Sequence, residues 1–217
     1  FSFFVNFYYS NLGSFPIDTF LHYDSGYRIL NNEIPIRDYW AVSGIIVDVI
    51  QAGFFKILGV NWIAYTIHSS TFNSLISIFM YLFFISRKIK KSKALIFTIC
   101  FTILAYTVSG TPFVDHHAVF FLLISSFLII KNFNSKNFFI WFVIILLFFL
   151  SFLSKQVPAS YIGLVYSPLL LWYFVNKKDL KKFFFIVSSI VVIIGLFLLL
   201  LIALKIDFKS FYIQYID

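Results

Sequence analysis

Cysteine, methionine and charged residues are scarce in this chain, and their scarcity excludes several classes of protein. The 217 residues include one Cys and one Met, and charged residues make up 12%. Because Cys100 lies alone inside an apolar run, neither a disulfide nor a cysteine metal site is expected. A glycine-rich phosphate loop and the GxSxG, HExxH and CxxC motifs are also missing, so nucleotide chemistry has no support in the sequence.

Apolar residues are abundant instead: 61% of the chain is hydrophobic and the mean hydropathy is +0.93. The polar residues are too few to cover a soluble globule. We therefore predict an all-α fold, a polytopic transmembrane helix bundle with juxtamembrane helices at its outer face. The net charge of +8 comes from basic residues in short loops between apolar runs, so no nucleic-acid partner is predicted.

The apolar runs define one transmembrane domain over residues 1–217, with six spans between residues 60 and 204. The predicted spans cover residues 60–86, 94–109, 118–130, 138–153, 161–175 and 183–204. Several are shorter than the roughly 20 residues that a span needs, so we expect them to take in loop residues. Residues 1–14 are interpreted as the end of a truncated first span and residues 205–217 as an outer-side tail. Without an initiator Met, the chain is expected to be a fragment of a longer protein.

Residues 15–59 form the longest stretch that is neither a short loop nor a span. They are interpreted as an outer loop, and they hold five of the nine acidic residues, namely Asp18, Asp24, Glu33, Asp38 and Asp48. The spacing predicts an amphipathic helix over residues 18–30, with an apolar face and an Asp24–Arg28 pair one turn apart. A second helix is predicted over residues 45–58, too short and too polar to cross a membrane, so it would lie at the interface.

The distribution of basic residues predicts the orientation in the cell membrane. Residues 87–93 contain five Lys or Arg, residues 131–137 two and residues 176–182 four, which makes eleven of the seventeen in alternate loops. Positively charged loops face the cytoplasm, so the acidic stretch 15–59 is expected on the outer side of the inner membrane.

Four places in the sequence could carry chemistry, and each has a plain structural alternative. Asp18 follows a helix break and is either a helix N-cap or a general base. The Asp115-His116-His117 loop suits a proton relay or a metal, or simply caps the next helix. His68 begins a span, where it lines a cavity or is a neutral hydrogen-bonded core residue. Lys155 contacts a lipid phosphate or extends to the interface from an apolar surface.

The segments RILNNEIPIRDYW and FFKILGVNW, which follow Asp18, resemble class C integral-membrane glycosyltransferases of the protein-mannosyltransferase and aminoarabinose-transferase type, glycosyltransferase family 39. In that family an Asp-Glu pair opens the first outer loop, and a segment similar to ilnGeiPyrDfw follows about a dozen residues later. Asp18 matches the first acid of the pair. The later segment is matched by Asn32, Glu33, Pro35, Arg37, Asp38 and Trp40. Thr19 replaces the second acid, Asn32 a frequent Gly, and Ser43-Gly44-Ile45 a Gly-Pro or Pro-Pro.

Two later segments also resemble the family: Asp115, at the start of an outer-side helix, and SKQVPAS, which contains Lys155. The resemblance implies an enzyme that transfers a sugar from a polyprenyl-phosphate donor to a lipid, glycan or protein acceptor at the outer face. Asp18 would then deprotonate the acceptor hydroxyl, and Lys155 would contact the carrier phosphate. Asp115, His116, Arg37 and Asp38 would line the substrate site. No cofactor is implied, and the participation of a divalent metal stays open.

Two other functions stay open at the level of sequence. A transporter or flippase of lipid-linked glycans would place ionisable residues or broken helices near the middle of the membrane, and the span centres from Ala94 onward lack them. A structural subunit of a larger assembly would bind a partner without turning over a lipid-linked sugar.

Overall fold

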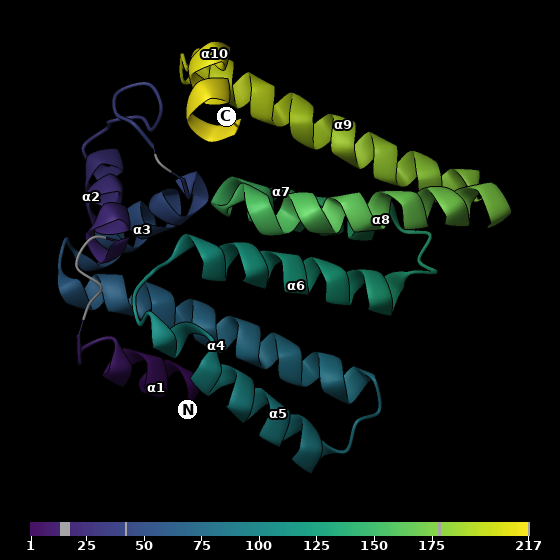
Figure 1. Cartoon of the computed structure of the whole chain (residues 1–217), viewed down its shortest axis with the longest axis horizontal. Coiled ribbons are helices and arrows are strands. Elements are labelled where there is room, and N and C mark those ends of the chain that lie inside the picture. The colour runs from purple at the N-terminus through teal and green to yellow at the C-terminus, as the bar shows by residue number, and fades with distance from the viewer. Residues whose placement is uncertain (14–17, 42, 178, 217) are drawn as a thin grey trace. The chain divides into compact units, whose positions relative to one another are not determined.

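The computed structural model describes residues 1–13, 18–41, 43–177 and 179–216, and over these residues the chain is all-helical (Figure 1). The single bridge among them pairs Pro35 with Tyr39 in the loop after the second helix. The chain forms two compact units, Phe1–His117 and Ala118–Asp217, where the sequence predicted one domain. The boundary falls inside a helix, so the sequence carries no linker that would mark it.

The first unit contains five helices and the first turn of a sixth. They are α1 (Ser2–Tyr9), α2 (Asp18–Leu30), α3 (Ile45–Leu58), α4 (Trp62–Ser86), α5 (Lys91–Leu104) and the start of α6 (Val114–Asn132), with a 3-10 turn at Tyr106–Val108. Helices α1 and α5 pack along α4, while α2 packs on α3 and α3 on α4. Figure 1 shows α2 and α3 together at one end of α4, the end at which α4 begins.

The second unit contains the rest of α6 and four further helices. They are α7 (Phe138–Ser154), α8 (Gln156–Lys177), α9 (Leu180–Ala203) and α10 (Phe208–Phe211), followed by a π-helical turn at Tyr212–Ile216. Helix α7 packs against both α8 and α9. Trp141, Ile144 and Ile186 form the buried core at one end of these contacts.

Within the described ranges, five helices are long and apolar enough to cross a membrane, namely α4, α6, α8, α9 and α5 extended through its 3-10 turn. Helix α7 is apolar but has 17 residues. Each of the six runs predicted as spans is therefore helical, and several take in loop residues, as expected. Short polar side chains set three of the helix starts, because Asn61, Asn137 and Asp179 each accept a backbone N–H of the following first turn.

Candidate functional site: a buried polar cluster

Helix α2 turns a polar face toward the protein, together with only part of its apolar one. Its buried residues are Thr19, His22, Ser25 and Gly26. Phe20 and Tyr27 on the predicted apolar face are about half exposed, at 51% and 48%. Tyr23 and Leu30 of that face pack on the core of Phe55, Ala64 and Tyr65. The interior at this end of the unit consequently contains polar side chains beside an apolar core.

Gly26 allows α2 and α3 to approach closely. A Cβ at Gly26 would lie 2.7 Å from Cγ of Gln51, a distance that a real Cβ does not tolerate. The close approach brings the buried face of α2 against Asp48 and Gln51, which lie one turn apart on α3 and are both buried.

His22 and Asp48 form a buried pair across this contact. Nδ1 of His22 lies 2.7 Å from Oδ1 of Asp48, and each side chain is 2% exposed. The Asp48 carboxylate also accepts a hydrogen bond from Ser25. Burial raises the pKa of Asp48 to about 6, and the hydrogen bonds and charge from His22 and Ser25 offset only part of the effect. The Asp48 carboxyl is therefore a weaker acid than an exposed aspartate.

A chain of hydrogen bonds leads from Gln51 through two further histidines. Nδ1 of His68 lies 2.8 Å from Oε1 of Gln51, and Nε2 of His68 lies 3.0 Å from Nε2 of His117. Nδ1 of His117 lies 2.9 Å from the hydroxyl of Tyr106, which accepts the backbone N–H of Phe113 at 2.8 Å. All four side chains are fully buried.

The carbonyl oxygen of Gln51 fixes the first link of this chain. Because Oε1 of Gln51 is an acceptor, Nδ1 of His68 carries the hydrogen, and Nε2 of His68 accepts from Nε2 of His117. Nδ1 of His117 contacts both the Tyr106 hydroxyl and the carbonyl oxygen of Phe113, which lies 3.1 Å away. These contacts hold both imidazole rings in place.

A second polar group joins α1 to α4 and to the loop before α6. The amide of Asn6 donates to Ser69 and Ser70 at 3.1 Å each and to the carbonyl of Gly110 at 3.3 Å. Gly110 has φ 71°, and a Cβ there would lie 2.7 Å from the backbone of Ser10. These bonds hold the helices together and supply no titratable group.

The structure places Asp18 as the first residue of α2, exposed to solvent, one helical turn before His22. Residues 14–17, which precede it, lie outside the described part of the chain. Asp18 and His22 share a face because residues four apart in a helix do. The predicted base and the buried His22–Asp48 pair are thus neighbours along one side of α2.

Asp115 and His116 lie in the first turn of α6, directly before His117. The His116 ring stacks on Tyr106, with centroids 4.6 Å apart, and its Nε2 lies 3.1 Å from the carbonyl of Ala105. His116 therefore flanks the hydrogen-bonded chain without being a link in it. The adjacent His116 and His117 point in different directions, as their helical spacing requires.

Arg37 and Asp38 bind each other. Nε and Nη2 of Arg37 donate to the Asp38 carboxylate at 2.9 and 2.8 Å, and the backbone N–H of Ile34 donates to it at 2.7 Å. The arginine and the Ile34 N–H lower the pKa of Asp38 to about 2. The pair closes the turn after α2 and is exposed to solvent.

Lys155 belongs to the second unit, where it ends α7 immediately before α8 begins. It is partly exposed. Its position between two apolar helices is the one predicted from the sequence.

Among the described residues, no three His, Cys, Asp or Glu side chains come together as metal ligands. His68 and His117 face each other, and the other ring nitrogen of each is hydrogen-bonded to Gln51 or Tyr106. The metal reading of the Asp115-His116-His117 loop gains no support from this arrangement.

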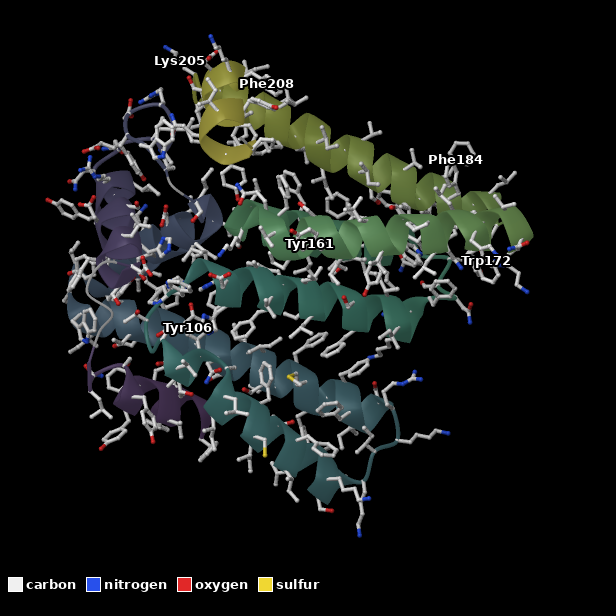
Figure 2. The ribbon with its side chains drawn as sticks, in the orientation of Figure 1. Tyr106, Tyr161, Trp172, Phe184, Lys205 and Phe208 are labelled. Carbon is white, nitrogen blue, oxygen red and sulfur yellow. The ribbon has the colours of Figure 1, made fainter. Side chains whose placement is uncertain are left out.

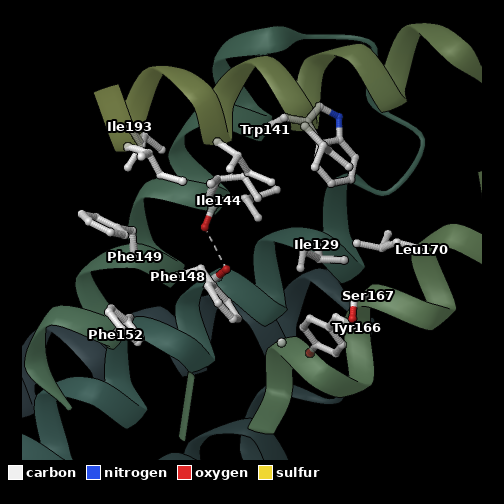
Figure 3. Close-up of a pocket in the computed structure, with 16 residues that line it drawn as sticks. Ile129, Trp141, Ile144, Phe148, Phe149, Phe152, Tyr166, Ser167, Leu170 and Ile193 are labelled. Carbon is white, nitrogen blue, oxygen red and sulfur yellow. Dashed lines mark hydrogen bonds between the residues drawn. The ribbon is translucent and has the colours of Figure 1, made fainter. Parts of the chain in front are cut away.

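The second unit contains an apolar cavity of about 400 Å³ between α6, α7, α8 and α9 (Figure 3). Its walls include Ile129, Trp141, Phe148 and Ile193, and Gly163 leaves room beside Phe148. The Ser125 hydroxyl in its wall donates to the carbonyl of Ile144 at 2.9 Å. The cavity therefore suits an apolar chain.

Sequence reasoning identified His68 and the 115–117 loop but missed the His22–Asp48 pair and the role of Gln51. The signal was present, because Asp48 and Gln51 interrupt an otherwise apolar helix. What the sequence lacked was the pairing, since the partners are 17, 26 and 49 residues apart.

Comparisons of the chain with protein-family models, with curated proteins and with solved structures found no match. The resemblance to class C glycosyltransferases carried by residues 18–40 therefore stays a prediction.

Proposed function

We propose that the protein is a multi-pass membrane glycosyltransferase that moves a sugar from a polyprenyl-phosphate donor to an acceptor at the outer face. One observation carries the proposal. The ionisable cluster of α2, α3, α4 and α6 gathers at one end of the first unit. His68 is the seventh of 25 residues of α4, and Asp115–His117 lie in the first turn of α6. A reaction on a lipid-linked headgroup needs its polar site at this level of the membrane.

Membrane insertion is supported by the outward apolar surface of the long helices. Trp172 of α8 and Phe184 of α9 are 69% and 67% exposed, and Figure 2 shows their side chains projecting from the ribbon. Such surface is unfavourable in water and favourable in hydrocarbon. The exposed Phe20, Tyr27 and Trp40 suit the aromatic belt of an interfacial helix. With the basic loops in the cytoplasm, α2 and α3 lie on the outer side.

In the proposed reaction the Asp18 carboxylate takes the proton of the acceptor hydroxyl. The acceptor oxygen attacks the anomeric carbon, the bond from that carbon to the phosphate oxygen breaks, and the carrier phosphate leaves with the electron pair. One base acting on one hydroxyl favours inversion at the anomeric carbon. The exposure of Asp18 is consistent with access to an acceptor.

Lys155 is the proposed cation for the carrier phosphate, since an ammonium at the end of apolar helices can bind it as a point charge. The apolar cavity of the second unit supports an apolar carrier, because its walls match a hydrocarbon chain. Arg37, Asp38, Asp115 and His116 are proposed to contact the sugar or the acceptor.

A transporter of lipid-linked glycans is the alternative. It is disfavoured because, on the described parts of α4–α9, every Asp, Glu, Lys, Arg and His lies within two turns of a helix end. A proton- or ion-coupled transporter places such groups near the middle of the membrane.

The test uses the complete protein in proteoliposomes supplied with a labelled polyprenyl-phosphate sugar and acceptors of each class. We expect Asp18→Asn to lower carrier turnover by about a hundredfold or more, the scale of a general base. Asp24→Asn is the matched control, since Asp24 is an exposed carboxylate on the same helix that pairs with Arg28 at 2.7 Å. Carrier that is never consumed, or an Asp18→Asn protein as active as the wild type, contradicts the proposal.

A further inference from the structure

We infer that the His22–Asp48 pair is a proton relay for Asp18, an inference that rests on the proposed function. The proton that Asp18 takes from the acceptor passes to His22, and Asp48 orients the imidazole and stabilises it when it is charged. After the product leaves, the proton returns through Asp18 to water, and His22 is neutral again. Asp18 thereby returns to its ionised form within the site. His22 and Asp48 are positioning residues in this scheme, because neither touches the reacting atoms.

The pair is difficult to explain as a packing device. Burying an ionisable pair generally stabilises a protein no better than apolar residues of the same size. The α2–α3 contact already has an apolar core in Phe55 and Tyr65, with Tyr23 and Leu30 packed on it, and a close approach at Gly26. A carboxylate bonded to an imidazole ring nitrogen is, by contrast, the usual way to fix a tautomer and to make the ring a stronger base.

A stripe of polar residues on α2 runs from the exposed start of the helix toward the protein interior. Asp18, His22 and Ser25 follow one another at four and three residues, so they form one stripe along the helix. Ser25 and His22 both hydrogen-bond the Asp48 carboxylate. The stripe therefore begins at the proposed base in solvent and ends at a buried carboxylate.

The ring of His22 is held from a third side. Gly44, at φ 78°, lies against it, and a Cβ there would be 3.0 Å from Cε1 of His22 and 2.2 Å from a methyl group of Val114. Any residue larger than glycine would displace the ring or α6. The loop before α3 and the start of α6 thus fix the imidazole at Asp48.

The groups that face this pair are known on each neighbouring element. They are Ser25 on α2, Tyr65 and His68 on α4, His117 on α6, and Tyr39 in the loop after α2. Asp18 and Gln51 lie one helical turn from His22 on α2 and from Asp48 on α3, respectively. Asp48 is the only Asp or Glu buried among the described residues, and it is the carboxylate that contacts the imidazole of His22.

The experiment measures the pH dependence of carrier turnover by the complete protein in proteoliposomes. We expect His22→Asn and Asp48→Asn to lower turnover by about ten- to a hundredfold, the range for a positioning partner of a proton-transfer group. Asp48→Asn is also expected to move the acidic limb of the rate profile to lower pH by about one unit or more, because the imidazolium loses its carboxylate. Asp48→Glu is expected to restore that limb in part.

Asn6→Ala serves as the control for a buried polar group of the same unit. It is expected to lower the unfolding temperature without moving the acidic limb. An Asp48→Asn protein with the wild-type acidic limb, or a His22→Asn protein with full turnover per folded molecule, overturns the relay. If Asp18→Asn is inactive while those two are normal, the relay fails and the glycosyltransferase stands. If the wild type consumes no carrier, the relay and the glycosyltransferase proposal fail together.

Discussion

The Asp38 carboxylate makes the stability of the turn after α2 depend on pH. Its carboxylate accepts two hydrogen bonds from Arg37 and one from Ile34, and these lower its pKa to about 2. In the unfolded chain the carboxyl titrates near its ordinary value of about 3.9. A carboxyl whose folded pKa is depressed stabilises the protein fully above the unfolded pKa and loses that contribution as pH falls through the folded one.

We therefore expect Asp38→Asn to lower the unfolding temperature at pH 7 but not at pH 2, with the difference shrinking between about pH 4 and pH 2. The measurement is thermal unfolding in detergent, followed by circular dichroism, for wild type and variant across this range. Arg37→Gln should behave in the same direction, since it removes the main cause of the shift. If the unfolding temperatures of wild type and Asp38→Asn differ by the same amount at every pH, Asp38 acts through packing rather than charge.

At this scale, local pairs were predictable and distant ones were not. The Asp24–Arg28 pair follows from a spacing of four residues and is confirmed, with Nε of Arg28 2.7 Å from Oδ2 of Asp24. The His68–His117 contact joins residues 49 apart and depends on how α4 meets α6. No periodicity within one helix contains that information, so the two histidines were visible as candidates but not as partners.

Among the elements, two helices between the first helix and the first long apolar one were predicted at Asp18–Leu30 and Ile45–Leu58, and both are confirmed. Their ends are marked in the sequence, because Asn31 and Asn32 follow the first and Gly44 and Gly59 flank the second. The later helices extend beyond the predicted spans. Helix α8 begins at Gln156 and not at residue 161, since Pro158 is tolerated in a first turn.

The contact of α2 with α3 at Gly26 is open to a direct test. We expect Gly26→Ala to destabilise the protein by about 1–3 kcal/mol, the usual cost of forcing a methyl group into a packed site. The added Cβ would displace Gln51, which accepts a hydrogen bond from His68. Gly53→Ala on α3 is the matched control, because nothing lies within 4 Å of its added Cβ.

Chemical unfolding in detergent micelles measures the free energy of unfolding of each variant relative to the wild type. Gly53→Ala should be neutral or stabilising by about 0.5–1 kcal/mol, since alanine favours the helix. Equal stability of the two variants would contradict the close contact of α2 with α3 at Gly26. That contact is what brings His22 within hydrogen-bond distance of Asp48.

Across the whole molecule, the two units differ in what they bury. The first buries His22, Asp48, Gln51, His68 and His117. Among its described residues, the second buries one charged side chain, Lys182, which pairs with Asp179 at 3.3 Å near a helix start, and elsewhere buried hydroxyls such as Ser125 and Ser151 donate to backbone carbonyls. Hydropathy alone could not predict this division, since both units contain long apolar helices. Because of this difference in buried groups, we place the proposed proton transfer in the first unit and the proposed binding of apolar chains in the second.

The orientation of the chain is testable at three exposed loop or helix-end positions. After Cys100→Ala, single cysteines at Asn31, Ser92 and Asn134 report on the loop after α2, the start of α5 and the α6–α7 loop, and all three native residues are exposed. Because basic loops stay in the cytoplasm, we expect a membrane-impermeant maleimide to label Asn31→Cys in intact cells. The other two should react only after the membrane is permeabilised. Labelling of Ser92→Cys or Asn134→Cys in intact cells would invert the topology and place Asp18 in the cytoplasm. A donor presented at the outer face could not then reach Asp18, so this labelling pattern decides whether the proposed reaction has access to its base.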